Sequence, residues 1–420
     1  MIWRSAQFML SLVLIALSVP SVAANGWVRV LDAQTGRPID GARVTVAGRV
    51  ASTDAEGLLT LPNPDMVLDV RAPGYRRMHL GDVGHAVNSR EIQLQPFRPK
   101  ALYLSFYGIG DRDLRGAALK LLGETELNAL VIDVKGDQGH IPYRSAVPLA
   151  ATVGAQKVIT VRDMPVLLTS LRERGIYTIA RIVAFKDDPL AHARPELAVR
   201  NQASEVWTDR EGLAWTDPFQ REVWDYLLAV AEEAARMGFD EIQFDYLRFP
   251  DEPGLVFSKP TTEANRVAAI SGFLTEATRR LAPYNVFVAA DVFGYVLWNT
   301  NDTDIGQRLE DLAPHLDYIS PMLYPSGFQN GIPGYRDPVA APHEIVELSL
   351  RNAQKRTRLP ALRFRPWLQA FRDYAFDHRV FGAEEIGGQI RAAEEFGSNG
   401  WMLWNPRNSY SAAGLRAKAK

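Results

Sequence analysis

From Ala101 onward, short apolar segments alternate with longer amphipathic segments. The apolar segments are rich in β-branched and aromatic residues, which favours buried strands. The segments between them repeat apolar residues at helical spacing, as residues 223–236 do. Eight such pairs in roughly 310 residues predict an α/β protein with a (β/α)8 barrel, the TIM barrel, with insertions. The expected strands cover residues 101–107, 129–135, 176–183, 240–246, 285–292, 316–323, 364–370 and 399–404.

The alternative arrangement for this pattern is a doubly wound parallel sheet. That fold carries a glycine-rich signature where the strand order reverses, and no Gly-x-Gly-x-x-Gly follows a strand here. The barrel, over residues 98–420, is therefore the prediction. Residues 25–97 have a different sequence pattern. Short segments in which apolar and polar residues alternate, such as 27–32 and 42–46, are separated by residues typical of turns. This spacing predicts a small β-sandwich in front of the barrel.

The first 24 residues predict an export signal. Arg4 is followed by an apolar stretch over residues 8–17, and Val22, Ala23 and Ala24 supply small residues for a cleavage site. An uncleaved anchor is the alternative, but the stretch is short for a membrane span. No later segment is long and apolar enough to cross a membrane. We therefore expect a secreted or periplasmic protein without a membrane contact after cleavage.

The amino-acid composition excludes several classes of partner and of catalytic site. The 420 residues carry a net charge of −2, which gives no sign of a nucleic-acid partner. The absence of Cys excludes disulfides, thiolate nucleophiles and Cys-based zinc sites. No His pair has metal-ligand spacing, and nothing predicts a metal or another cofactor. Loop carboxylates at Asp187, Asp188 and Asp251 leave calcium open as an alternative.

Polar residues recur where the expected strands end. In a (β/α)8 barrel the carboxyl ends of the strands form the face that holds the active site. Asp245 ends the fourth strand and Asp291 ends the fifth, and these two are the predicted catalytic residues. The other strand-end residues suit sugar hydroxyls and sugar faces, and we expect them to bind substrate. They are Tyr107, Asp133, Lys135, Arg181, Arg248, Tyr324, Gln369, Trp404 and Asn405.

Two carboxylates across a cleft are the apparatus of glycoside hydrolysis. One donates a proton to the leaving oxygen, and the other attacks the anomeric carbon or activates water. Arg248 and Lys135 are placed to keep one carboxylate ionised, and Asp133 is a third carboxylate candidate. In the plainer interpretation, Asp245 and Arg248 only form a salt bridge at a strand end.

Two resemblances extend these predictions. Residues 36–44, 53–57 and 72–75 resemble the carboxypeptidase regulatory-like domain, which implies a transthyretin-like sandwich without catalysis of its own. Residues from about 101 to 410 resemble a bacterial family of exported barrels classed as glycoside hydrolases, and this implies a polysaccharide or oligosaccharide substrate. The segments that carry the second resemblance are 131–135, 210–218, 241–250, 304–307, 318–325, 365–369 and 400–406.

Wider families assign roles to the two Asp residues. Asp245 resembles the strand-4 nucleophile of α-amylase-like barrels, and Asp291 stands where those enzymes carry a Glu acid/base. The strand around Asp245 also resembles that of chitinases, but Leu247 occupies the position of their catalytic Glu. A non-catalytic carbohydrate-binding or scaffold protein is the alternative function, and an amidase is a weaker one. The sugar, the linkage, the stereochemical outcome and the oligomeric state stay open.

Overall fold

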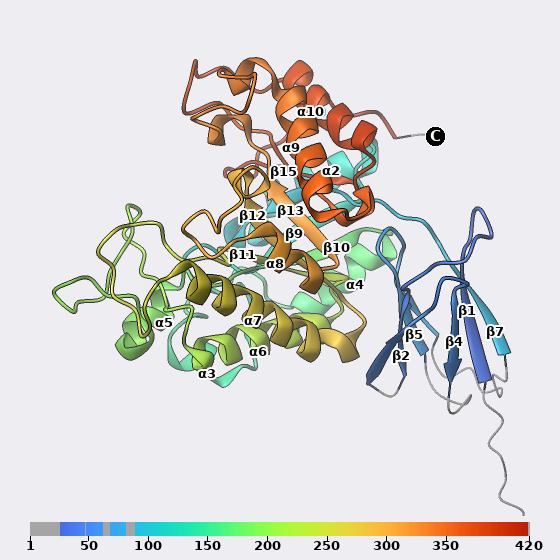
Figure 1. Cartoon of the computed structure of the whole chain (residues 1–420), viewed down its shortest axis with the longest axis horizontal. Helices are drawn as coiled ribbons and strands as arrows, with labels where there is room; N and C mark the ends of the chain where they lie inside the picture. The colour runs from blue at the N-terminus through green and yellow to red at the C-terminus, as the bar shows by residue number, and fades with distance from the viewer. Residues whose placement is uncertain (1–25, 47, 62–67, 81–88, 419–420) are drawn as a thin grey trace, which may run out of the picture.

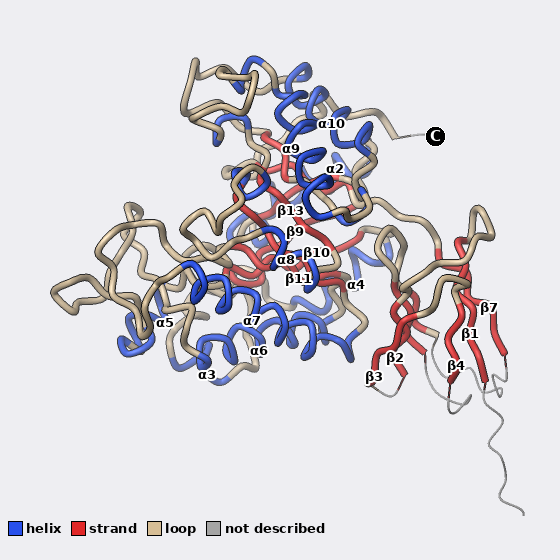
Figure 2. The backbone as a smooth tube through the Cα atoms, in the orientation of Figure 1, coloured by secondary structure: helices blue, strands red, loops and turns tan. Residues whose placement is uncertain are grey.

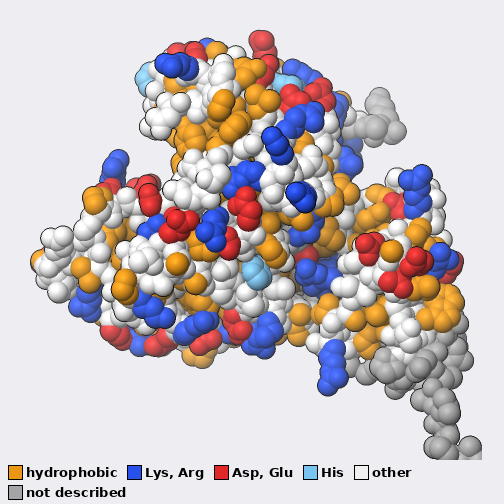
Figure 3. Space-filling view, viewed as in Figure 1, with side chains coloured by type: hydrophobic (Ala, Val, Ile, Leu, Met, Phe, Trp, Pro, Cys, Tyr) orange, Lys and Arg blue, Asp and Glu red, His pale blue; other side chains and the backbone are white. Residues whose placement is uncertain are grey.

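The computed structural model describes residues 26–46, 48–61, 68–80 and 89–418 (Figure 1). The expected export signal lies outside these residues and stays a prediction. None of the helices in the described ranges is long and apolar enough to cross a membrane. On the face shown in Figure 3, acidic and basic side chains are intermingled, in keeping with the small net charge.

Eight parallel strands close into a barrel, which confirms the predicted fold class. The strand order around the barrel is β8-β9-β10-β11-β12-β13-β14-β15, with β15 pairing back to β8. Helices surround the strands (Figure 2). The barrel strands are β8 (Lys100–Leu104), β9 (Ala129–Lys135), β10 (Tyr177–Val183), β11 (Glu241–Asp245), β12 (Phe287–Phe293), β13 (Tyr318–Met322), β14 (Trp367–Gln369) and β15 (Trp401–Trp404).

The helices lie mostly in the connections between these strands, as the amphipathic pattern predicts. The expected helix over 223–236 is part of α6, which ends where Gly238 adopts the left-handed conformation, with φ 105°. Residues 405–418 contain no helix and return to the start of the barrel, where Ala417 bridges to Thr125. The helices are α1 (Phe106–Gly110), α2 (Arg112–Glu124), α3 (Pro148–Thr152), α4 (Met164–Glu173), α5 (Asp188–Ala193), α6 (Arg221–Met237), α7 (Glu263–Leu281), α8 (Leu309–Leu312), α9 (Pro342–Thr357) and α10 (Ala383–Phe396).

The interior of the barrel changes from apolar to polar along each strand. Alternate residues point inward because the side-chain period of a strand is two. On β10 the inward residues are Tyr177, Ile179 and Arg181, and on β12 they end at Asp291. Apolar side chains therefore fill most of the interior, and charged side chains occupy the layer at the carboxyl ends of the strands.

The N-terminal segment forms two small antiparallel-rich sheets that share one apolar core, which includes Val30, Val44 and Ile92. One sheet has the order β4-β1-β7 and the other β3-β2-β5-β6. The sequence pattern did not predict β3, because all four of its residues are exposed and show no alternation. The strands are β1 (Gly26–Asp32), β2 (Arg43–Val46), β3 (Arg49–Ser52), β4 (Leu58–Leu61), β5 (Leu68–Arg71), β6 (Met78–His79) and β7 (Ser89–Leu94).

These sheets pack against the amino-terminal end of the barrel. Arg77 Nε lies 3.1 Å from Asp240 Oδ1, and Asp240 directly precedes β11. Tyr318, at the start of β13, accepts a hydrogen bond from the backbone N–H of Gly74 at 3.1 Å. The N-terminal sheets thus lie at one end of the barrel, away from its carboxyl-terminal face (Figure 1). The likeness to a carboxypeptidase regulatory-like domain stays a prediction.

Candidate active site

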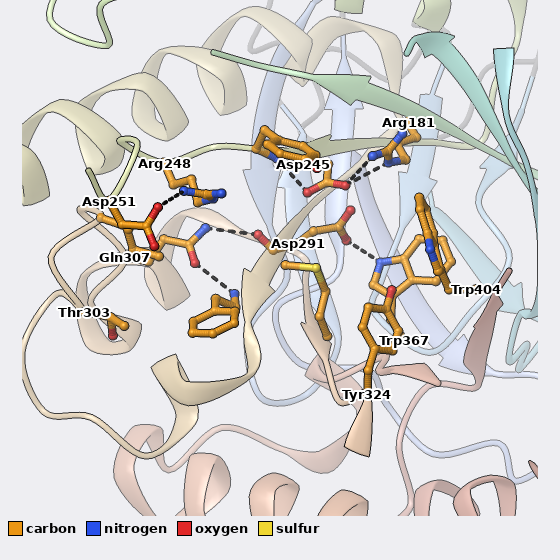
Figure 4. Close-up of a pocket in the computed structure, with 14 residues that line it drawn as sticks. Arg181, Asp245, Arg248, Asp251, Asp291, Thr303, Gln307, Tyr324, Trp367 and Trp404 are labelled. Atoms are coloured by element: carbon orange, nitrogen blue, oxygen red, sulfur yellow. Dashed lines mark hydrogen bonds and ion pairs between the residues drawn. The ribbon is translucent and has the colours of Figure 1, made fainter. Parts of the chain in front are cut away.

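A cavity of about 370 Å³ opens at the carboxyl-terminal face of the barrel (Figure 4). Both predicted catalytic residues line it, from the ends of the neighbouring strands β11 and β12. Its walls come from β10, β13, β14 and β15 and from the loops that follow β11 and β12. The lining residues are Arg181, Asp245, Tyr246, Arg248, Asp251, Asp291, Phe293, Thr303, Ile305, Gln307, Met322, Tyr324, Trp367 and Trp404.

Asp245 is held as an ion pair. Its Oδ2 accepts hydrogen bonds from Arg181 Nε at 2.8 Å and Arg181 Nη2 at 2.6 Å. Its Oδ1 accepts a bond from the backbone N–H of Tyr246 at 2.6 Å. Tyr246 has φ 47°, an uncommon conformation for a residue with a side chain, and such backbone strain concentrates at functional sites. The carboxylate is therefore fixed in orientation and its charge is compensated.

Asp291 has the opposite environment. It is buried, and its Oδ1 accepts a single hydrogen bond from Trp367 Nε1 at 2.7 Å. Its Oδ2 is buried without a hydrogen-bond partner in the described residues. Burial, and next the nearby charge of Asp245, raise the pKa of Asp291 well above its ordinary value. This raised pKa favours the protonated form of Asp291.

Arg181 connects three carboxylates. Besides Asp245, its guanidinium donates to Asp133 Oδ1 at 2.8 Å and to Asp137 Oδ1 at 2.7 Å. Asp133 also accepts bonds from the Tyr103 hydroxyl and the backbone N–H of Phe106, both at 2.9 Å. Burial raises the pKa of Asp133 to about 6, against the opposing effect of Arg181. The charge balance of this face thus depends on one buried arginine.

Two features shape the walls of the cavity. Trp404 stacks on Tyr103 with ring centroids 4.0 Å apart and planes 14° apart, and Arg181 lies 5.0 Å from the Trp404 ring. On the other side, Gln307 donates to the backbone oxygens of Leu247 and Asp291, both at 3.2 Å. Gln307 thereby fixes the loop that follows β12 against the strand ends.

Of the predicted binding residues, Arg181, Arg248, Tyr324 and Trp404 line this cavity. The plainer interpretation paired Arg248 with Asp245, but the structure does not show this pair. Its Nη1 lies 3.7 Å from Asp251 Oδ1, and its guanidinium lies 5.0 Å from the Trp215 ring. Asp245 is instead paired with Arg181 from the neighbouring strand β10.

The other predicted binding residues lie elsewhere. Tyr107 and Asp133 line a second, adjacent cavity. Gln369 is buried and bonds to Ser326 and Gln389, and Asn405 Nδ2 donates to the backbone oxygen of Ala370 at 2.7 Å. Both residues hold loops together and do not line either cavity. A substrate-binding role for them stays a prediction that this geometry does not favour.

Tyr107 does not end the first barrel strand, which corrects the expected boundary. β8 ends at Leu104, and Ser105 caps α1 by accepting a hydrogen bond from the Gly108 N–H. The strand residue that reaches the site is Tyr103, which sequence reasoning missed. The alternation of Ala101 and Tyr103 with Leu102 and Leu104 was the available signal.

Lys135 lies outside the cavity because the strand pairing shifts. Between Arg181 and Ile182 the register with β9 slips by one residue, so that Lys135 lies opposite Ile182, which faces the helices. There Lys135 Nζ lies 2.9 Å from Asp187 Oδ2 and donates to the Val183 oxygen at 2.8 Å. Both charged side chains are 0% exposed. Their role in the described geometry is to hold the loop after β10.

Replacing Lys135 with Met is expected to lower the free energy of unfolding by about 3–5 kcal/mol, because Asp187 then keeps a buried charge without its partner. Denaturant unfolding measures the effect. Lys120→Met removes an exposed lysine and serves as the control, with a change within about 0.5 kcal/mol. Similar unfolding curves for both variants would contradict the role of the pair.

The loop carboxylates raised as calcium ligands are dispersed. Asp187 pairs with Lys135, and Asp251 is largely exposed beside Arg248. Asp188 accepts a bond from the backbone N–H of Ala214. In the described part of the chain, no three His, Asp or Glu side chains are grouped as metal ligands would be.

Comparisons with known proteins give one family and several similar structures. Residues 101–410 match the family described as "Putative glycosyl hydrolase domain". Among solved structures, a hypothetical protein from Ruminiclostridium thermocellum ATCC 27405 shares 36% identity, with 46% of this chain and 97% of that one covered and a TM-score of 0.40. A comparison with curated proteins found no match.

Two glycoside hydrolases are among the similar structures. The PgaB (BpsB) glycoside hydrolase domain from Bordetella bronchiseptica is 14% identical, with 74% of this chain and 95% of that one covered and a TM-score of 0.50. A class V chitinase from Pseudomonas fluorescens Pf-5 is 13% identical, covers 74% of this chain and 96% of its own, and has a TM-score of 0.45. At 14% identity, the likeness to the PgaB (BpsB) domain shows the fold alone.

Proposed function

We propose that this chain, which belongs over residues 101–410 to the family described as "Putative glycosyl hydrolase domain", is an exported glycoside hydrolase that cleaves a polysaccharide. The observation that carries the proposal is one cavity in which the carboxyl groups of Asp245 and Asp291 have opposite environments. Asp245 is ion-paired with Arg181, whereas Asp291 is buried with one unpartnered oxygen. Such a division of roles is what glycoside hydrolysis requires.

In the proposed reaction, Asp291 donates its proton from Oδ2 to the glycosidic oxygen as the bond to the anomeric carbon breaks. Asp245 acts on the same carbon, either by attacking it or by taking a proton from the water that attacks it. Arg181 holds the Asp245 carboxylate in place, and Trp367 holds Asp291 through Oδ1. Trp404 and Tyr324 provide aromatic surface for the sugar ring.

The reaction is tested by the release of new reducing ends. The chain without residues 1–24 is incubated with α-glucans, amino-sugar polymers and bacterial exopolysaccharides. Release from one polymer class supports the proposal and names the substrate. Binding of a polymer without release would favour the alternative, a carbohydrate-binding protein on a hydrolase-like barrel. The export step is tested by the N-terminus of the secreted protein, which we expect to be Asn25.

Asp291→Asn is expected to lower kcat/KM on the polymer by about 10²–10⁴-fold, because the variant has no proton for the leaving oxygen. On an aryl glycoside whose phenol leaves without a proton, the loss is expected to be much smaller. The wild-type enzyme requires protonated Asp291, so its activity falls as the pH rises through the raised pKa of this group. Equal losses on both substrates would contradict the role of Asp291 as acid.

The stability of the same variant provides an independent control. A carboxyl whose pKa is raised by folding binds its proton more tightly in the folded state than in the unfolded state. The folded protein therefore loses stability as the pH rises above the ordinary pKa of the carboxyl. Asp291→Asn removes that effect. We expect the variant to melt at a higher temperature than the wild type at alkaline pH, and the difference to shrink in acid. If the variant melts at a lower temperature than the wild type at alkaline pH, its loss of activity is explained by a damaged fold and not by the missing proton.

A further inference from the structure

A second cavity of about 220 Å³ adjoins the first and has no role in the reaction described above. It lies between the β8–α1 connection and the loop that follows β9. Its lining residues are Tyr103, Ser105, Phe106, Tyr107, Asp133, Gly136, Asp137, Gln138, His140, Trp404 and Pro406.

The two cavities share a wall. Trp404 lines both of them, and Arg181 binds Asp245 on one side and Asp133 and Asp137 on the other. Figure 4 shows Trp404 at one end of the first cavity and Thr303 at the other, with Asp245 and Asp291 between them. The carboxyl groups of Asp245 and Asp291 therefore lie between the two ends of the first cavity, and Trp404 borders the second cavity as well.

The second cavity has the chemistry of a sugar site. Tyr107 is 57% exposed, and its ring is supported edge-on by Phe106, with centroids 4.9 Å apart. The ring of His140 also lies edge-on to Phe106, with centroids 6.0 Å apart. The side chain of Asp137 is 39% exposed and can accept hydrogen bonds from hydroxyl groups. Aromatic surface with a few polar groups at its edge is typical of a site for a small polar ring.

The charge of the cavity limits which sugar it accepts. Its lining includes the carboxylates of Asp133 and Asp137, and none of the residues that line it in the described structure is Lys or Arg. The guanidinium of Arg181 is already bound by three carboxylates. An anionic sugar such as a uronic acid would meet like charge here, whereas an uncharged pyranose would not.

We infer that the cavity beside Tyr107 is a second sugar-binding subsite, which takes an uncharged pyranose unit of the same polysaccharide. The inference rests on the proposed function. A chain that occupies both cavities passes over Trp404 and has sugar units on both sides of Asp245 and Asp291. The protein then cuts within the polysaccharide and does not remove single units from its end.

The test measures binding in the Asp245→Asn background, in which hydrolysis is expected to be suppressed. The probes are oligomers of glucose and of N-acetylglucosamine from disaccharide to heptasaccharide, with galacturonic acid oligomers as the anionic comparison. Tyr107→Ala is expected to weaken binding of the longest neutral oligomers about tenfold, and the loss is expected to grow with chain length. Tyr284→Ala is the matched control, because Tyr284 lies before β12 at the opposite end of the barrel.

Three results of the binding test overturn the inference. They are equal binding by Tyr107→Ala and its parent at every length, preference for the anionic oligomers, and the absence of binding by any neutral oligomer. The products released by the active enzyme provide a second readout. Oligosaccharides are expected as the first products. Monosaccharide as the only early product would also overturn the inference. Tyr107-dependent binding without reducing-end release would support the subsite while the proposed hydrolase function fails. If Tyr107→Ala releases reducing ends as well as the wild type does, the hydrolase function is supported and the subsite is not.

Discussion

Replacing Asp245 with Asn is expected to lower reducing-end release by about 10³-fold or more, with the fold intact. Asn has nearly the same shape as Asp but carries no negative charge, so it can neither attack the anomeric carbon nor take a proton from water. Its side-chain oxygen can still accept a hydrogen bond from Arg181, which limits the structural disturbance. The measurement is kcat/KM on the polymer identified by the panel, beside the circular dichroism spectrum and melting temperature.

Asp304→Asn is the matched control for this variant. Asp304 is also a carboxylate in the loop region of this face, but its side chain is 83% exposed and it pairs with Arg266 outside the cavity. We expect its activity to stay within about threefold of wild type. If Asp245→Asn retains a tenth or more of the wild-type activity while folded, Asp245 is not the nucleophile or the base.

The barrel could be predicted because its strands are short and almost wholly buried. β9 covers residues 129–135, as expected, and β10 begins one residue after the expected start. The predicted ends of the strands are less accurate where a strand leaves the apolar interior of the barrel. The first strand stops at Leu104 because Ser105 caps a helix there, and this local choice moves Tyr107 from the strand to α1.

The candidate site could be predicted only in part, because a strand-end position does not determine where a polar side chain points. Asp245 and Asp291 face the cavity, in line with the alternation of their strands. Lys135 does not, because the register shift beside Ile182 moves it to the helix side, and nothing in the local sequence marks that shift. Gln369 is equally polar but stabilises neighbouring loops.

The partners of the site residues depend on which strands are neighbours in the barrel. Arg181 is 48 residues from Asp133 and 64 from Asp245 along the chain, yet it binds both because β10 lies between β9 and β11. The neighbouring residue Arg248 was the more obvious partner for Asp245 from the sequence. Sequence proximity thus indicated the wrong cation, whereas the order of strands in a (β/α)8 barrel could have indicated the right one.

Replacing Arg181 with Met is expected to have the largest effect on stability, a loss of about 5 kcal/mol of unfolding free energy at pH 8. The substitution leaves Asp133 and Asp245 as buried carboxylates without their cation and removes the partner of Asp137. Arg181→Lys is expected to recover only part of the loss, because an ammonium group lacks the planar arrangement of donors that reaches all three carboxylates.

The pH dependence distinguishes this explanation from a simple packing defect. Without Arg181 the carboxylates are stabilised only when protonated, so their destabilising effect is present at alkaline pH and is lost as the pH falls. Asp133, whose pKa burial already raises to about 6 with Arg181 present, is expected to titrate first. Denaturant unfolding at pH 5 and pH 8 should therefore show a smaller difference from wild type in acid, and Asp133→Asn added to Arg181→Met should recover stability at pH 8. A deficit that is the same at both pH values would mean that Arg181 acts through its packing against Trp404 and Tyr103, and the charge balance of this face would need another explanation.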